Sequence, residues 1–436
     1  MKYYPAYKDS KIEWFPSIPK HWQLIKLGRI GRFSASGIDK KSDASELPVR
    51  MVNYTNVYGN SSLEIKFSEN LMETTTTLEK VREHSLKKGD MVFTPSSETA
   101  EDIGLSAVVT AELRNTVYSY HLIRLRTGER YNLNLGFKKY FCNVHEVLSQ
   151  FSKACKGTTR QILGRDDFKD ILILLPPVSE QKIIAEYLNR KAAQVDDLIA
   201  KKERMIDLIK EERAAITNRA VTKGLDPNVE MKDSGIEWLG KMPKHWQMKR
   251  LKYLVSLVNQ PIEEVNGAEL RIDLENLESW TGKTIELESQ DQNNEGMKSF
   301  APGDVLFNKL RPYLAKVYRA KNCGVCGGEL LVLRPTTLID PDFLFCRVLS
   351  SAFINVVDGS TYGSKMPRAS WDFIGNLIVP FPSKPEQIKI AEYLHQTLQR
   401  MDIILQKLGS EIEYLREYRT ALISEVVTGK IDVRGF

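Results

Sequence analysis

The sequence predicts a mixed α/β fold in which two tandem α/β domains are each followed by a long helix. The two helices are predicted to pack together as an antiparallel coiled coil. Three observations support this prediction. The 436-residue chain consists of two copies of one unit, each copy ends in a heptad pattern, and short β-like runs alternate with turn residues in the middle of each copy.

The two copies are most alike where each unit begins. The segment KDSKIEW at 8–14 recurs as KDSGIEW at 232–238, and PKHWQ at 19–23 recurs at 243–247, so both matches are offset by 224 residues. Four of the six tryptophans lie in these segments. Two matches at one offset indicate a duplication, because chance similarity would not keep a fixed spacing.

Further matches lie inside each unit and at its end. The pair GD at 89–90 recurs at 303–304, an offset of 214, and a stretch that begins at Glu180 recurs from Glu386, an offset of 206. The second middle therefore lacks 18 residues (224 − 206). Matched ends and a variable middle predict a common framework that carries two different recognition surfaces. The predicted order is domain, helix, domain, helix, with boundaries at 1–175, 176–225, 226–382 and 383–436.

The end of each unit has the periodicity of a coiled coil. From Ile184 a 4,3 spacing selects mostly apolar positions over about four heptads, and the second copy keeps the same register. Lys191, Lys202 and Glu212 fall at the same spacing, where we expect them to set the register of the helices. The seam residues predicted for packing between helices or against a partner are Ile184, Leu188, Val195, Leu198, Met205, Ile209, Ile390, Leu394, Met401, Ile404, Leu408 and Leu415.

Local signals mark the ends of both helices. The prolines at 176–177 cannot continue a preceding strand, and Ser179 is a suitable N-cap, while Ser383 begins a capping box in the second copy. Gly224 and Gly429 are suitable C-terminal stops. Each helix then has roughly 40 residues, or about 60 Å. Neither buries its apolar seam alone, so we expect them to pack on each other and hold the domains apart; stalks that dimerise with another chain are the alternative.

Loops in the globular parts carry the candidate binding residues. The loops at 156–161 and 358–365 are rich in glycine, hydroxyl and basic residues, which suit phosphate contacts, and 308–313 combines amide, basic and aromatic groups. Asn and Arg are able to pair with adenine and guanine edges. The predicted nucleic-acid contacts are Lys156, Thr158, Arg160, Gln161, Asn308, Lys309, Arg311, Tyr313, Lys365 and Arg368.

Motifs for catalysis or metal binding are weak in this sequence. The GKT at 282–284 lacks the first glycine of a phosphate-binding loop, since Leu277 stands there. Cys323 and Cys326 form a lone CxxC, which we interpret as a turn between strands and not as a zinc site. His21 and His245 recur with the duplication beside Trp and Lys, so we expect structural roles. The sequence predicts no catalytic residue and no metal.

Composition adds few constraints. The net charge of +6 is compatible with nucleic-acid binding but does not argue for it. The first residues have no apolar core of the kind a secretion signal needs, and no stretch reaches the ~20 apolar residues of a membrane span. We therefore expect a cytoplasmic protein with no membrane partner.

Together these features resemble the specificity subunit of type I restriction–modification enzymes over nearly the whole chain. Each target-recognition domain of that family opens with a segment like the Pro-x-x-Trp at 19–22 and 243–246, and carries a Gly-Asp turn. A Gly-Thr-rich loop, Pro-Pro-x-x-Glu-Gln and a long helix then follow. The second copy departs from this pattern with Phe-Pro at 381–382 and Ser-Thr-Tyr in its loop.

The resemblance implies a function. Such subunits bind a bipartite, asymmetric site in double-stranded DNA, one half per domain, roughly one helical turn (~34 Å) or more apart. Two methyltransferase (modification) subunits use S-adenosylmethionine to methylate adenine N6, and restriction/translocase subunits use ATP and Mg²⁺. This chain itself would hold no cofactor and catalyse no reaction. Two alternatives stay open: a self-contained endonuclease, and a coiled-coil scaffold that binds only protein.

Overall fold

The computed structural model describes residues 2–66, 71–128, 130–259, 270–285, 296–363 and 365–436. The chain forms two compact units. Unit 1 comprises 1–201 and 411–436, and unit 2 comprises 202–410, so each unit contains one globular domain and a segment of each long helix. The mixed α/β fold with two long helices is confirmed. The boundaries drawn between domains and helices stay a prediction.

The domain of unit 1 is built on a five-stranded sheet and a three-stranded sheet. The larger sheet has the order β4 (Gly31–Ala35), β12 (Ile123–Thr127), β8 (Met91–Phe93), β10 (Ser106–Val109) and β6 (Glu64–Ile65). The smaller has the order β11 (Thr116–Tyr118), β5 (Leu47–Val52) and β7 (Met72–Thr76). Three two-stranded pairs complete it: β1 (Tyr7–Asp9) with β2 (Ser17–Pro19), β3 (Gln23–Lys26) with β14 (Leu172–Leu175), and β9 (Ser96–Ser97) with β13 (Gln161–Ile162).

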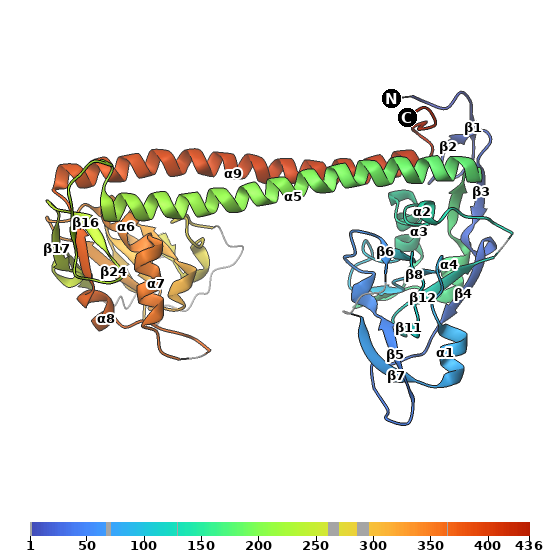
Figure 1. The fold of residues 1–436 in the computed structure, drawn as a ribbon, viewed down its shortest axis with the longest axis horizontal. Helices are drawn as coiled ribbons and strands as arrows, with labels where there is room; N and C mark the ends of the chain where they lie inside the picture. The colour runs from blue at the N-terminus through green and yellow to red at the C-terminus, as the bar shows by residue number, and fades with distance from the viewer. Residues whose placement is uncertain (1, 67–70, 129, 260–269, 286–295, 364) are drawn as a thin grey trace. The chain divides into compact units, whose positions relative to one another are not determined.

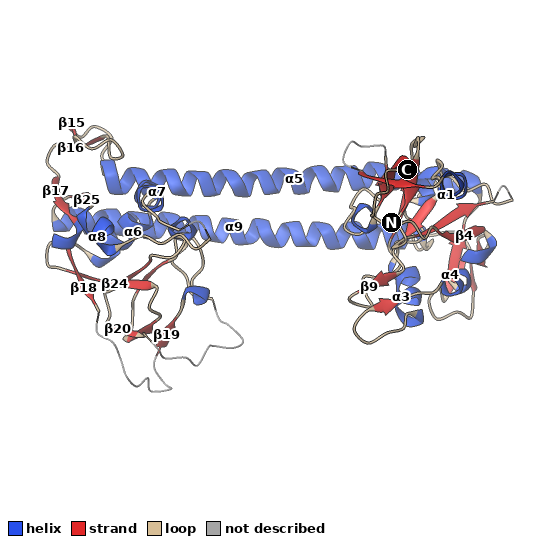
Figure 2. Cartoon of the chain, turned by 90° about the horizontal axis from the view of Figure 1, so that it is seen from below, coloured by secondary structure: helices blue, strands red, loops and turns tan. Residues whose placement is uncertain are grey.

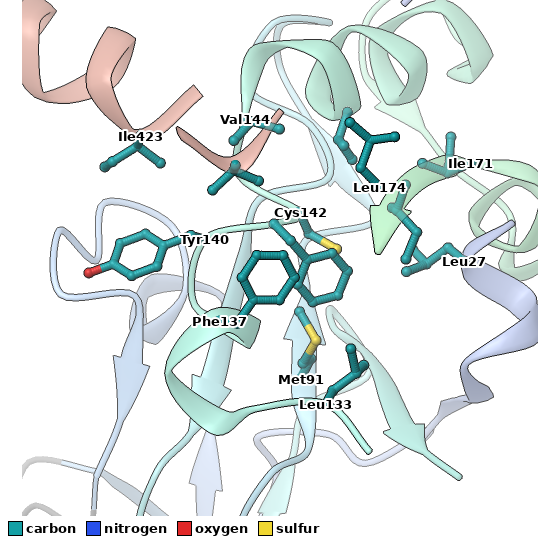
Figure 3. Packing of buried hydrophobic residues seen from close by; sticks show 14 of the residues in the cluster. Leu27, Met91, Leu133, Phe137, Tyr140, Cys142, Val144, Ile171, Leu174 and Ile423 are labelled. Carbon is teal, nitrogen blue, oxygen red and sulfur yellow. The ribbon is translucent and has the colours of Figure 1, made fainter. Parts of the chain in front are cut away.

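Short helices cover this domain: α1 (Leu78–His84), α2 (Leu135–Lys138), α3 (His145–Ala154) and α4 (Arg165–Asp170), with 3₁₀ turns at Leu27–Arg29 and Tyr54–Asn56. Figure 3 shows the core, where Phe137 and Met91 from different elements lie close together. Ile423, near the end of the chain, belongs to the same core, so a segment of the last helix closes unit 1.

The domain of unit 2 repeats this plan, with a four-stranded sheet in place of the five-stranded one. The four-stranded sheet has the order β18 (Val255–Val258), β24 (Leu330–Pro335), β21 (Val305–Asn308) and β22 (Val317–Arg319). The three-stranded sheet has the order β19 (Leu270–Ile272), β23 (Gly324–Cys326) and β20 (Lys298–Phe300). The pairs are β15 (Met231–Asp233) with β16 (Lys241–Pro243) and β17 (Gln247–Arg250) with β25 (Ile378–Phe381). The helices are α6 (Pro341–Leu349), α7 (Ser351–Gly359) and α8 (Trp371–Asn376), and 3₁₀ turns lie at Leu251–Tyr253, Leu274–Asn276 and Pro312–Leu314.

Cys326 lies in β23 and is buried, whereas Cys323 before it is exposed. The expected turn between strands therefore holds only for Cys323, because the other three residues of the CxxC form β23, which pairs with both neighbours in its sheet. In the described part of the chain, no group of three or more His, Cys, Asp or Glu side chains is arranged to hold a metal ion. None of the described helices combines the length and apolar character needed to cross a membrane.

The two long helices are α5 (Val178–Lys223), with 46 residues, and α9 (Lys384–Val427), with 44. Gly224 and Gly429 follow them with left-handed φ angles of 76° and 74°, as expected for C-terminal stops. Ser179 is not an N-cap, because α5 already begins at Val178. In each unit, a segment of α5 lies beside a segment of α9 (Figures 1 and 2).

The side chains turned away from solvent define the packed seam. In α5 from 192 to 213, every residue that is not exposed follows one 4,3 spacing: Ala192, Val195, Ile199, Lys202, Ile206, Ile209 and Arg213. In α9 the equivalent positions, 206 residues later, are likewise not exposed: Leu398, Met401, Leu405, Leu408, Ile412, Leu415 and Arg419. The repeat therefore extends to the packing of the helices.

This seam differs from the predicted one at alternate positions. Ile184, Leu188, Val195, Ile390, Leu394, Met401 and Leu408 are buried, and Ile209 and Leu415 are partly buried. Leu198, Met205 and Ile404 are 42%, 50% and 44% exposed, so as positions of packing between the helices they are corrected to Ile199, Ile206 and Leu405. Each residue of these pairs is apolar, so the sequence satisfies both versions of the 4,3 spacing.

An ion pair joins the two helices in each unit. In unit 2, Arg213 of α5 pairs with Asp402 of α9. In unit 1, Arg419 of α9 pairs with Asp196 of α5 at 3.0 Å. The two arginines are 206 residues apart, and so are the two aspartates, so the pairs are equivalent under the repeat.

Candidate nucleic-acid interface

In each copy of the repeat, the opening segment is held by a glutamate near the start of the long helix that follows the domain. In unit 1, the Glu180 carboxylate lies 2.6 Å from His21 Nε2 and accepts from Trp22 Nε1 at 2.9 Å. In unit 2, Glu386 lies 2.9 Å from His245 Nε2 and accepts from the Trp246 indole at 3.0 Å. These contacts give both histidines the structural role that the sequence predicted.

The Gly-Asp pairs are also structural. Asp90 accepts two hydrogen bonds from the guanidinium of Arg126 in β12, at 2.8 and 2.6 Å. Asp304 accepts two equivalent hydrogen bonds from Arg334 in β24, at 2.9 and 2.7 Å. Both aspartates are buried, and the hydrogen bonds hold the pKa of each arginine above its usual value. The framework of each domain is therefore built from the same contacts.

Two loops meet beyond these framework contacts in the second domain. The main chain of Leu310 bridges that of Arg368, and Arg311 N donates to Pro367 O at 2.7 Å. Ala369 N donates to Lys309 O at 2.9 Å. The structure thus brings together two of the stretches that the sequence singled out, although more than fifty residues separate them.

The first domain contains the same arrangement. β9 pairs with β13, and Leu163 N donates to Pro95 O at 2.8 Å, the counterpart of the Ala369 contact. A short hairpin precedes each contact: Lys156 pairs with Ile162, and Tyr362 pairs with Arg368. We call these segments the loop platform, which comprises 95–97 with 156–162 in the first domain and 309–311 with 362–368 in the second, apart from Ser364, which lies outside the described residues. Figure 2 labels β9 beside α3.

A glycine with a left-handed φ turns each hairpin. Gly157 has φ 130° and Gly363 has φ 90°. A Cβ on Gly157 would lie only 2.0 Å from Arg160 O, so glycine is required there for the close approach of the chain to itself. The hairpin backbone is therefore common to both domains, and the side chains on it differ.

The structure exposes three of the four predicted contacts of the first domain. Lys156, Thr158 and Arg160 are exposed. Gln161 is different: its amide donates to Gly157 O at 2.9 Å and its Oε1 lies 3.3 Å from the Cys155 sulfur. Gln161 therefore holds the hairpin closed, and its direct contact to DNA stays a prediction.

In the second domain the predicted residues take different positions. Lys365 is exposed, and Tyr313 is 47% exposed. Lys309 and Arg311 are partly buried on the platform. The side chain of Asn308 is buried and bonds both main-chain groups of Leu310, at 2.5 and 2.8 Å, and its contact to DNA stays a prediction. These two bonds form the turn that starts the loop.

Arg368 is oriented by Glu329, a residue that the sequence did not mark. The guanidinium donates to the carboxylate from Nε at 3.3 Å and from an NH₂ group at 2.8 Å, which raises the pKa of Arg368. The Lys309 amine lies 3.9 Å from the same carboxylate. Nothing in the sequence pattern pairs residues that lie 39 positions apart, so only the fold reveals this contact.

Aromatic side chains beside Arg160 were also missed. Tyr54 stacks on Tyr58 with ring centroids 5.3 Å apart, and Tyr120 lies against His121 at 3.8 Å. Burial is the main cause that lowers the pKa of His121, and the charge of Arg160 lowers it further. Exposed aromatic rings near cationic groups suit stacking on bases and contacts to sugar or phosphate.

Comparisons with known proteins agree with this arrangement. The profile of the family described as type I restriction modification DNA specificity domain matches residues 19–208 and 243–414, once for each copy of the repeat. The EcoDI specificity subunit of Escherichia coli is 23% identical over 296 residues, which cover 63% of this chain and 66% of that protein. The MjaVIII specificity subunit of Methanocaldococcus jannaschii is 21% identical over 445 residues, which cover 96% of this chain and 94% of that protein.

Solved structures share the fold. The HsdS subunit from Thermoanaerobacter tengcongensis has a TM-score of 0.55 and 16% identity, over 95% of this chain and 98% of that one. A chain from a structural study of assembly and conformational transition of the type I R-M system has a TM-score of 0.64 and 17% identity, over 95% of this chain and 99% of that one. Because the family profile covers most of the sequence in two successive matches, this chain belongs to the type I restriction–modification DNA specificity family.

Proposed function

We propose that this chain is the DNA-recognising subunit of a type I restriction–modification complex. Each domain binds one half of a bipartite, asymmetric site in double-stranded DNA. The observation that carries this proposal is the loop platform, which has the same main-chain contacts in both domains and different side chains. A repeated backbone supplies the same approach to the groove, and different side chains select different bases.

Partner subunits supply the chemistry in this proposal. Two methyltransferase subunits transfer a methyl group from S-adenosylmethionine to adenine N6, and restriction/translocase subunits use ATP and Mg²⁺ to cleave. This chain is non-catalytic and holds no cofactor. It belongs with its complex in the cytoplasm.

Exposed apolar side chains recur on the two long helices. Leu198 and Leu208 of α5 are 42% and 48% exposed. Their counterparts 206 residues later, Ile404 and Tyr414 of α9, are 44% and 68% exposed. Exposed apolar positions that recur with the duplication suit two copies of one partner. The predicted seam residues Leu198 and Ile404, which do not pack between the helices, thus become candidates for partner contact.

A reconstituted methyl-transfer assay tests the proposal. The full chain, the methyltransferase subunits of the same host and labelled S-adenosylmethionine are incubated with unmodified genomic DNA. We expect labelled N6-methyladenine only when this chain is present, and cleavage only after the restriction subunits, ATP and Mg²⁺ are added. Cleavage by the chain with Mg²⁺ alone would instead establish an endonuclease. Failure of the assembled complex to retain any DNA would establish a protein-binding scaffold.

A further inference from the structure

One platform position carries very different side chains in the two domains. Ile162 and Arg368 each end their hairpin: Ile162 N donates to Lys156 O at 2.8 Å, and Arg368 N donates to Tyr362 O at 3.1 Å. The next residue in each case bonds the neighbouring loop, at Pro95 O or Lys309 O. Because the main chain on both sides is fixed by matched contacts, the two side chains leave equivalent positions of the platform.

Both side chains are available to a ligand. Ile162 is 54% exposed, and the side chain of Arg368 is 41% exposed. An aliphatic side chain matches the methyl group of thymine, whereas a guanidinium matches the O6 and N7 acceptors of guanine. The same position therefore suits different bases in the two domains.

Glu329 holds the Arg368 guanidinium in one orientation. The carboxylate occupies Nε and one N–H of one terminal nitrogen, at 3.3 and 2.8 Å. A guanidinium has five N–H donors, so three stay available on the terminal nitrogens. Holding the planar group in one orientation reduces the conformational entropy that a base contact would otherwise cost.

Backbone strain at Arg311 is an independent sign of function at the same place. Arg311 has a left-handed φ of 52° and precedes Pro312, and Ala315 has φ 46°. Left-handed backbone is unfavourable for residues other than glycine, and such strain collects at ligand-binding sites. The hydrogen bond from Arg311 N to Pro367 O maintains it and ties it to the hairpin of Arg368.

The surroundings of the platform suit a polyanion. Lys298 donates to Leu330 O at 3.0 Å and to Gly328 O at 3.2 Å, and burial followed by the charge of Lys309 lowers its pKa. Lys365 is exposed on the hairpin. Cationic groups around a fixed arginine favour DNA without choosing its sequence.

We propose that this single platform position determines base preference in both half-sites. Arg368, oriented by Glu329, selects guanine in the half-site of the second domain, and Ile162 selects thymine in that of the first. Glu329 is a positioning residue and touches no base. This inference rests on the proposed function, and adds to it which residues distinguish the halves.

Selection from a DNA pool tests the inference. The full chain is incubated with duplexes randomised over both halves and the gap, and the retained molecules are sequenced. Three variants are compared. R368K keeps the positive charge but removes the planar guanidinium, E329Q removes the negative charge of the carboxylate, and I162A shortens the aliphatic side chain. R250K and E275Q are controls on exposed residues of the second domain that are not part of the platform.

We expect R368K to reduce the preference for one guanine by about 10-fold or more, with the other half-site unchanged. E329Q should reduce the same preference by a smaller factor, and I162A should affect only the first half-site. The unaffected half-site of each variant shows that the chain is folded. Equal weakening of all sequences by R368K, with a reduced salt dependence, would assign Arg368 to a phosphate and overturn the inference. No bipartite enrichment by the unsubstituted chain would instead refute the proposed function.

Discussion

Single residues in this chain are repeated because they hold the framework. Glu180 and Glu386 each bind a His-Trp pair from the opening segment of a unit. Their neighbour is equally specific: the Gln181 amide donates to Pro176 O at 2.9 Å, and the Gln387 amide donates to Pro382 O at 2.9 Å. The Glu-Gln motif thus joins three segments in each copy, which explains why the duplication preserves it.

The two glutamates should differ in their contribution to stability. Glu180 is 9% exposed in its side chain and also accepts from Tyr4 at 3.3 Å, whereas Glu386 is 30% exposed. Because a buried donor left without a partner costs about 1–3 kcal/mol, E180A should lower the free energy of unfolding by about 2–3 kcal/mol and E386A by about 1 kcal/mol. Urea unfolding followed by tryptophan fluorescence measures both. An E386A effect equal to or larger than that of E180A would contradict this ranking.

Arg347 of α6 is a buried cation with few partners. It is fully buried, donates to Val221 O of α5 at 3.3 Å, and lies 5.3 Å from the Trp238 ring centroid. Its Nε and its other terminal nitrogen find no hydrogen-bond partner in the described part of the chain. Burial lowers the pKa of Arg347 to about 9, so the charged side chain is less stable in the folded chain than in water, although it stays protonated at pH 7.

This arrangement predicts an unusual mutational pattern at Arg347. R347M keeps most of the volume and removes the buried charge, so it should leave the free energy of unfolding within about 1 kcal/mol or raise it. R347A also leaves a cavity and should lower stability by about 3 kcal/mol or more. Thermal unfolding at pH 7 distinguishes the two variants. If R347M were as damaging as R347A, the charge itself would be stabilising and the argument would be wrong.

The sequence revealed some of the residues that build the framework but not the contacts between them. His21 and Trp22 recur in the second copy, which indicated a structural role. Their partner Glu180 lies 159 positions from His21, so the sequence did not reveal the contact. Likewise Asn308 and Gln161 have the chemistry of base contacts, and only the structure shows that their amides already bind main-chain groups. Residue type alone does not reveal which polar side chains already form hydrogen bonds within the chain.

Among the elements, the long helices show both the strength and the limit of periodicity. The heptad pattern predicted that α5 and α9 exist and where they end, because Gly224 and Gly429 interrupt an otherwise regular sequence. It did not choose between neighbouring apolar residues such as Leu198 and Ile199. The choice depends on which face meets the other helix, and the exposed member of each pair stays free for a partner.

The ion pairs between the helices should contribute unequally despite their equivalence. Arg213 and Asp402 are 13% and 21% exposed in their side chains, and Asp402 also lies 2.9 Å from the Lys283 amine. In the other pair Asp196 is 53% exposed. We therefore expect D402N to lower the free energy of unfolding by about 3 kcal/mol, since it leaves a buried cation without its counterion. D196N should cost at most about 1 kcal/mol.

Urea unfolding of these two variants at low and high salt provides the measurement. The effect of D196N should shrink in 1 M salt, where exposed charges are screened, and most of the effect of D402N should persist. Equal effects of the two substitutions at both salt concentrations would contradict the assignment of one pair as buried and the other as exposed.

For the whole molecule, the duplication predicted the fold class more reliably than it predicted the site. The matched segments at 8–14 and 232–238 established two copies, and short β-like runs indicated α/β domains. The strands themselves pair in an order that no local signal gives, such as β8 between β12 and β10. The platform was found only in fragments, because its two loops lie more than fifty residues apart in the sequence.

Each domain combines a framework that recurs in both copies with a loop platform whose side chains differ between them. Contacts made by Asp90, Glu180 and their counterparts recur almost atom for atom, and the platform keeps its main chain while its side chains change. A chain of this construction should not recognise a symmetric sequence. Its two domains present Ile162 and Arg368 from equivalent positions, so the two halves of its target should differ.

Sequencing of modified adenines across the host genome, with and without this chain, tests that claim most directly. The account predicts N6-methyladenine at sites made of two unlike half-sites separated by a constant gap, with one modified adenine in each half. All of these modifications should disappear when the chain is deleted. Methylation at one contiguous sequence, or at a site with two identical halves, would contradict the account.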